Sequence, residues 1–233
     1  MKDKKKEKPD EKSKSGGIAF LISIILLYII GCVSIIAVIL ILSVMGALEY
    51  TWFRFFVGFA TGLVIFSFSG LDGFRTFLHE AKHAVMVIIS GNSLKEFHAS
   101  EHSGHVTYEL QEDNLQSAPW ITLAPYCLPL FSLPLFIICL FVSDKNHPLF
   151  TILLAAALGI DFTTGLHEIH ISQTDLKRIY GGIMISASFI GAMFFSWFSF
   201  CLLWIIAGNH GVLIFFQLFM EMIASLFTRI WGD

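Results

Sequence analysis

Cysteine is scarce in this 233-residue chain, and its four copies lie far apart in the sequence. Cys32, Cys127, Cys139 and Cys201 all fall within apolar segments, and no C-x-x-C pair is present. This spacing argues against a disulfide framework and against a thiolate metal centre. We therefore expect the cysteines to pack as small apolar residues. The chain also shows no internal repeat, and its first apolar run is too long for a signal peptide and has no small-residue cleavage site.

Apolar residues, in contrast, are abundant. They make up 55% of the chain, with 24 phenylalanines, and the mean hydropathy is +0.73. A membrane-spanning helix needs about 20 consecutive apolar residues. Six stretches meet this requirement: 18–44, 51–69, 119–142, 148–167, 181–207 and 210–230. The segment 72–90 is expected to form a further, more polar helix. The sequence therefore predicts an all-α polytopic membrane protein with about six to seven membrane helices.

The expected organisation has four parts. A disordered Lys-rich tail over 1–17 precedes two membrane helices over 18–69, a core over 70–180 and C-terminal helices over 181–233. The lysine excess beside the first span favours a cytoplasmic N-terminus, and the cell membrane is the expected location. Lys177 and Arg178 favour a second cytoplasmic loop, which requires an even number of crossings before it. The helix over 72–90 would then be re-entrant or an incomplete crossing.

The motif His79-Glu80-Ala81-Lys82-His83 matches the H-E-x-x-H pattern of zinc hydrolases. Residues four apart on a helix lie on the same face, so both imidazoles point in one direction. Glu80 is placed to reach a water on the metal without being a ligand itself. The motif predicts a catalytic zinc site with His79 and His83 as ligands and Glu80 as the catalytic base.

A second segment, 98–102, matches the inverted pattern H-x-x-E-H. It lies beside the turn signal Ser103-Gly104 and the strand-like 106–108 segment. In an extended segment His98 and His102 are too far apart to share a metal, so we do not expect a site there. The polar residues to which the sequence assigns no role are His98, His102, His105 and Glu221.

A catalytic zinc site needs a third protein ligand and one open position. Asp161 is expected to fill this role, because an ionisable side chain inside an apolar span is costly and a metal would stabilise its charge. The alternative is a hydrogen-bonded Asp161 that ties two helices together. Glu168, which would give a His, His, Glu ligand set, and Asp175, which could fold back over the site, are the other candidate ligands.

A helical H-E-x-x-H inside a multi-span chain, with a buried aspartate in a later span, resembles the site-2-protease class of intramembrane zinc metalloproteases. The resemblance covers roughly 70–180 and includes the segment from Gly91 to Tyr108, which looks like the small β-element after the metal helix. In that family the element is thought to pair with an unwound substrate strand. The family commonly has a Leu-Asp-Gly signature downstream of the metal helix. In this chain no close match follows the motif, and the upstream triplet at 71–73 is interpreted as a coincidence, which indicates a divergent member.

The expected function is that of a zinc-dependent intramembrane endopeptidase with one Zn²⁺ per chain. Its partners would be membrane-spanning or membrane-proximal protein substrates and the bilayer, with no nucleic acid. Two alternatives stay open. The first is a non-enzymatic packing or regulatory membrane protein with a fortuitous motif, and the second is a His, His, Glu membrane zinc peptidase that uses Glu168.

Overall fold

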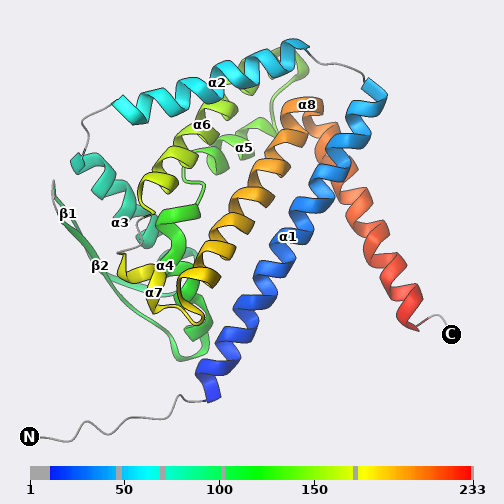
Figure 1. Cartoon of the computed structure of the whole chain (residues 1–233). Coiled ribbons are helices and arrows are strands. Elements are labelled where there is room, and N and C mark those ends of the chain that lie inside the picture. The colour runs from blue at the N-terminus through cyan, green and yellow to red at the C-terminus, as the bar shows by residue number, and fades with distance from the viewer. Residues whose placement is uncertain (1–10, 46–48, 69–71, 101–102, 170–172, 232–233) are drawn as a thin grey trace, which may run out of the picture.

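The computed structural model describes residues 11–45, 49–68, 72–100, 103–169 and 173–231. Helices dominate this part of the chain, and one antiparallel two-stranded sheet accompanies them (Figure 1). The elements in chain order are α1 (Glu11–Met45), α2 (Glu49–Phe68), α3 (Asp72–Ile89), β1 (Ser93–Ala99), β2 (Gly104–Glu109), the 3-10 turn η1 (Glu112–Ser117), α4 (Ala118–Cys127), α5 (Ser132–Cys139), the 3-10 turn η2 (Asp144–Asn146), α6 (His147–His167), α7 (Thr174–Arg178) and α8 (Gly182–Trp231). The small β-element that the sequence predicts after the helix carrying the H-E-x-x-H motif is therefore present.

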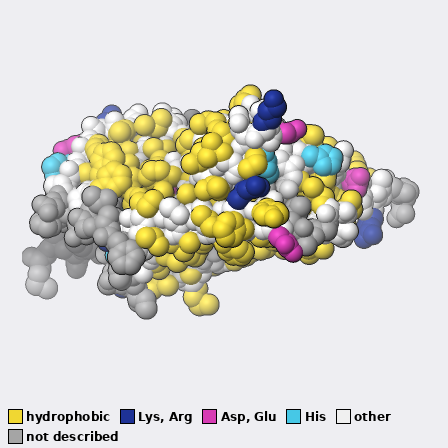
Figure 2. All heavy atoms as spheres, turned by 90° about the horizontal axis from the view of Figure 1, so that it is seen from above, with side chains coloured by type: hydrophobic (Ala, Val, Ile, Leu, Met, Phe, Trp, Pro, Cys, Tyr) yellow, Lys and Arg dark blue, Asp and Glu magenta, His cyan; other side chains and the backbone are white. Residues whose placement is uncertain are grey.

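Four of the described helices are long and apolar enough to cross a membrane, or up to five if a bent pair is counted as one span. They lie in α1, α2, α6 and α8. Large hydrophobic side chains are exposed along them, and Figure 2 shows that such side chains cover much of one face of the molecule. The predicted helical architecture is confirmed, and these four to five candidate spans support the prediction of a membrane protein. The more polar α3 is not among the candidate spans.

The stretch 119–142, predicted as one span, is not a single straight helix, because the chain bends sharply in its middle. The helical segment Asn114–Cys127 and helix α5 meet at an angle of 87°. Pro129 follows Leu128, whose ψ of 121° is extended rather than helical. Proline restricts the residue before it to such conformations, so the helix ends there. The bend directs backbone N–H groups at the start of α5 toward Asp161 of α6.

Helix α8 consists of two limbs joined at Ala207 and Gly208, where the backbone is non-helical. Gly208 has φ 58° and ψ −146°, a region that is open essentially to glycine alone. Figure 1 shows the ribbon turning back at this point. The predicted break between 207 and 210 is confirmed. At Gly211 a side chain would collide with the carbonyl oxygen of Leu203, so a second glycine lets the limbs approach each other.

The N-terminal helix begins at Glu11, within the segment 1–17 that the sequence predicts as disordered. Glutamate and lysine are good helix formers, so the apolar helix extends into this polar stretch. Residues 1–10 of the predicted tail lie outside the described part of the chain.

Two apolar clusters hold the helices together. The larger one joins α1, α2, α5, α6 and α8 around Leu154 and Trp204. The second joins α1, α4, α7 and α8 around Phe20, Tyr126 and Phe189. The second cluster concerns the site directly, because it fixes the two short helices α4 and α7 beside α3.

Candidate metal centre

Helix α3 carries both motif histidines on the face that meets α4. The rings of His79 and His83 are half-buried, their centroids lie 5.1 Å apart, and their planes are inclined by 72°. This is the arrangement that the i, i+4 spacing predicts for two side chains one helical turn apart. The H-E-x-x-H segment is therefore helical, as the sequence indicates.

The ring of His83 is oriented by the backbone of α4. Its Nδ1 lies 2.7 Å from the carbonyl oxygen of Ile121. A carbonyl can only accept, so Nδ1 carries the proton and Nε2 keeps its lone pair. Burial, together with the neighbouring His79, lowers the pKa of His83 to about 4. The imidazole is thus neutral at pH 7, which is the form that binds metals.

The ring of His79 is oriented by a carboxylate. Its Nδ1 lies 3.1 Å from Oε2 of Glu168, directly after the end of α6. Burial raises the pKa of Glu168, but the hydrogen bond and the electrostatic interaction with His79 more than compensate, and the net shift of the pKa is downward. As a carboxylate, Glu168 accepts a hydrogen bond from the Nδ1–H group of His79, and Nε2 of His79 keeps its lone pair. Metal-binding histidines are commonly oriented by carboxylate and carbonyl partners of this kind.

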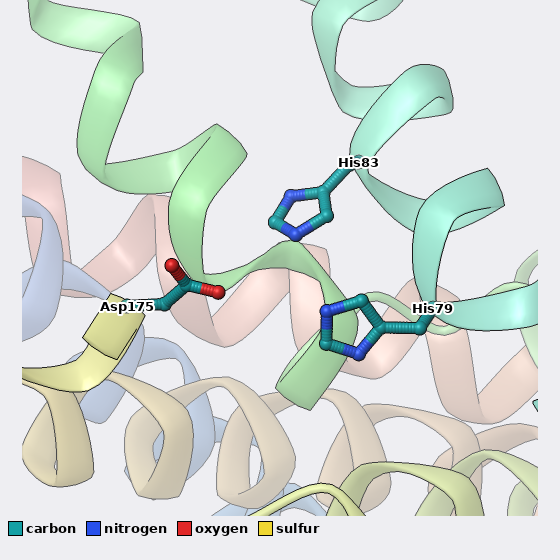
Figure 3. A group of neighbouring side chains, drawn as sticks. All are labelled: His79, His83 and Asp175. Carbon is teal, nitrogen blue, oxygen red and sulfur yellow. The ribbon is translucent and has the colours of Figure 1, made fainter. Parts of the chain in front are cut away.

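Asp175 faces the two histidines from the first turn of α7, and Figure 3 shows the three side chains pointing toward one another. One ligand atom from each lies within 4.8 Å of the other two. In a tetrahedral zinc site with bonds of about 2.1 Å, ligand atoms are roughly 3.4 Å apart, so a small inward adjustment suffices. Leu176 and Ile179 are buried in the second apolar cluster and anchor α7 in this position. The residues present fit a zinc ion.

Asp161, the expected third ligand, does not lie in this group. Its carboxylate accepts hydrogen bonds from the backbone N–H groups of Phe131 and Ser132, at 3.1 and 2.7 Å, and from the Ser132 hydroxyl at 2.6 Å. These donors belong to the first turn of α5, where helix N–H groups lack partners within the helix. Asp161 is thus a buried cap that ties α6 to α5, the alternative that the sequence left open. Among the described acidic residues, Asp175 is the one that joins both histidines.

Glu80 lies under the β-hairpin and is 8% exposed. A side chain at Gly104, the first residue of β2, would come within 2.8 Å of its Oε1. The strand can cross Glu80 so closely because this position is glycine. Burial raises the pKa of Glu80, partly offset by the charge of His79. A carboxylate with a raised pKa is a stronger proton acceptor than an ordinary carboxylate.

An open pocket with a volume of about 550 Å³ reaches the centre from the side of His79 and Glu80. It is lined by Arg75, Thr76, His79, Glu80, Gly104, His167, Glu168 and Gln173. The Arg75 guanidinium lies 3.1 Å from Nε2 of His167 and donates to the Phe66 carbonyl oxygen at 2.8 Å. Polar groups therefore surround the approach to the motif, so water can reach it.

Lys82 points away from the histidines and is 1% exposed. Its ammonium group donates to the Pro125 carbonyl oxygen at 3.2 Å and lies 3.1 Å from the Thr164 hydroxyl. These contacts join α3 to α4 and α6. They fix the rotation of α3 about its axis, and with it the direction of the two imidazoles.

The inverted motif at 98–102 is split by the hairpin. His98 lies in β1 opposite His105 of β2, with ring centroids 5.4 Å apart. Glu101 and His102 lie outside the described residues. Within the described part of the chain, the only three-residue group of potential metal ligands is His79, His83 and Asp175.

The sequence does not identify the two groups that orient the histidines. Glu168 is visible as a candidate ligand, but its role toward Nδ1 of His79 depends on where α6 ends. The Ile121 carbonyl has no side-chain signature at all. Comparison with family models, with curated proteins and with solved structures finds no match to this chain.

Proposed function

We propose that this protein is a zinc-dependent endopeptidase embedded in the membrane, similar in chemistry to the site-2 proteases. The observation that supports this most strongly is the orientation of the two histidines. Both Nδ1 atoms have acceptors, so both Nε2 atoms are available on the side where Asp175 lies. A fortuitous H-E-x-x-H segment would not require both remaining imidazole nitrogens to converge with a carboxylate.

His79, His83 and Asp175 would hold one Zn²⁺ per chain. Two imidazole nitrogens and one carboxylate oxygen are typical donors of catalytic zinc, and they leave a fourth position open. Zinc bound there supplies a water of lowered pKa and a Lewis acid for the scissile carbonyl.

Glu80 is the catalytic base of the proposal. Its carboxylate accepts the proton of the attacking water and passes it to the leaving amine. Glu168 and the Ile121 carbonyl hold the imidazoles in place, and Gly104 keeps β2 close above Glu80. The proposed base and one of the two oriented histidines therefore line the same open pocket, through which a substrate would enter.

The proposed substrates are membrane-spanning or membrane-proximal polypeptides. A helical substrate hides its carbonyls in backbone hydrogen bonds, so it must unwind before attack. Strand β1, whose side chains are almost all exposed, could pair with such an unwound segment.

A multi-pass arrangement in the cell membrane with a cytoplasmic N-terminus completes the proposal. The apolar segment of α8 has 48 residues, and at 1.5 Å per residue a helix of this length would measure about 72 Å, twice the thickness of the hydrocarbon core. Counting its two limbs separately, and the bent pair around Leu128 as one span, gives about six crossings, within the predicted range.

The test compares the wild type with Glu80→Gln, both purified in detergent. Zinc is measured by mass spectrometry, and cleavage is followed on a solubilised single-span polypeptide. We expect about one zinc per chain in both proteins and a loss of activity of roughly 10²- to 10⁴-fold in the variant.

Three results would contradict parts of the proposal. Wild-type protein without stoichiometric metal would favour the non-enzymatic alternative. Undiminished cleavage by Glu80→Gln would exclude Glu80 as the base. Zinc lost from Glu168→Ala but retained by Asp175→Ala would favour the His, His, Glu type of site.

A further inference from the structure

The C-terminal limb of α8 carries a polar stripe along one side. Its members are His210, Gln217, Glu221, Ser225 and Thr228. At 100° per residue all of them lie within about 60° of one line along the helix. Every one of these side chains is exposed.

With the limb crossing the bilayer, as in the proposed topology, the middle of the stripe lies deep in the membrane. The limb from Asn209 to Trp231 is about 33 Å long, close to the thickness of the hydrocarbon core. Glu221 is therefore near mid-depth, and Gln217 is one turn away. No described residue donates a hydrogen bond or forms an ion pair with Glu221. A carboxyl group exposed to acyl chains is costly, so this surface requires a polar partner.

The other side of the limb is already occupied. Val212 and Phe215 are buried in the larger apolar cluster. Beyond the turn the limb leaves the bundle toward the C-terminus (Figure 1), and the residues beside the stripe remain open, with Leu213 59% and Met220 62% exposed. The stripe therefore faces outward, where another helix can reach it.

We propose that the stripe is the interface of a parallel homodimer, and that the C-terminal limb of a second copy covers it. Two copies in the same membrane orientation place their limbs parallel and at equal depth. The Gln217 amide of each copy can then donate to the Glu221 carboxyl group of the other, one helical turn away, in two reciprocal bonds. Ala224, on the same side, is small enough for the backbones to approach.

The stripe's own chemistry favours a second copy over a different membrane protein. A foreign helix would need its own polar groups matched in depth to both Gln217 and Glu221. A second copy satisfies both, because the donor and the acceptor lie on one self-complementary face. The proposal is independent of the zinc site.

Disulfide cross-linking of the full-length protein in bilayers tests the interface. Native Cys32, which is exposed, is first replaced by alanine. Ala224→Cys then places a thiol on the stripe, and Ile223→Cys places one at the same depth but about 100° away. We expect the dimer yield from Ala224→Cys to exceed that from Ile223→Cys by about tenfold.

The polar pair is tested in the Ala224→Cys protein. Replacing Gln217 and Glu221 together by leucine should lower the dimer yield about tenfold, whereas Glu221→Gln, which can still donate and accept, should retain it. Circular dichroism confirms that each variant is folded. Equal cross-linking at 223 and 224, or an undiminished dimer in the double leucine variant, would overturn the proposal. Single copies of the wild type in photobleaching of dilute bilayers would overturn it as well, and would assign the stripe to a different membrane protein.

Discussion

Replacing Asp161 by alanine should lower the stability of the fold, whereas replacing Asp175 by alanine should impair metal binding. Asp161 is 4% exposed and accepts hydrogen bonds at the start of α5, whereas Asp175 is half-buried beside two histidines. We therefore expect Asp161→Ala to weaken the fold and keep its zinc. Asp175→Ala should keep the fold and lose the zinc.

The magnitudes follow from the contacts of each carboxylate. Without Asp161, the N–H groups of Phe131 and Ser132 lose their acceptor in a buried position, at about 1–3 kcal/mol each, or roughly 2–6 kcal/mol in the free energy of unfolding. Without Asp175, the site loses one of its three protein ligands. Removal of a group that merely orients a ligand already lowers metal affinity about 10- to 100-fold, so the loss here should be at least 100-fold.

Two measurements on the same preparations separate the effects. Zinc affinity is obtained by competition with a chromophoric chelator, and unfolding is followed by circular dichroism during titration with SDS. The reasoning fails if Asp161→Ala unfolds like the wild type but has lost its zinc, or if Asp175→Ala binds zinc with unchanged affinity. Either result would return the third-ligand role to Asp161 or assign it elsewhere.

Three shorter predictions concern the surroundings of the site. Glu168→Ala should lower zinc affinity about 10- to 100-fold, because the His79 ring loses its orienting acceptor; unchanged affinity would show that this hydrogen bond has no such role. Gly104→Ala should reduce cleavage without unfolding the hairpin, because the added methyl group displaces Glu80. Cleavage kinetics would show the loss of activity, and circular dichroism would show that the fold is retained. Gly62→Ala should destabilise the protein by about 1–3 kcal/mol in the SDS titration, because its methyl group meets the backbone of α6. Gly191→Ala, which meets only the Tyr28 hydroxyl at 3.7 Å, is the matched control and should unfold like the wild type.

Local features of the site could be predicted from the sequence because they depend on neighbouring residues. The helix over 72–90 is observed as Asp72–Ile89, and the strand-like segment around Val106 is observed as β2. Helical periodicity alone places His79 and His83 on one face. The break in α8 likewise coincides with the glycine at 208, whose conformation other residues rarely adopt.

The bend between α4 and α5 shows where such local reasoning stops. Hydropathy indicates one apolar stretch over 119–142, and composition does not distinguish a straight span from a bent pair. The prolines in this stretch mark a possible break, but the angle of 87° depends on packing against α6 and α8. This bend also creates the row of unpaired N–H groups that Asp161 caps.

The sequence by itself determines that this is a helical membrane protein and that two histidines and a glutamate share one helix, because apolar length and the 3.6-residue period are local properties. Tertiary structure decides which acidic residue meets the histidines. Asp161 and Asp175 are equally visible in the sequence, but only Asp175 reaches both histidines. Leu176 and Ile179, buried in the second apolar cluster, hold α7 against α4 and α8 in the position that allows this. The imidazole orientation was likewise fixed by distant groups, the Ile121 carbonyl and Glu168, whose positions no local pattern encodes.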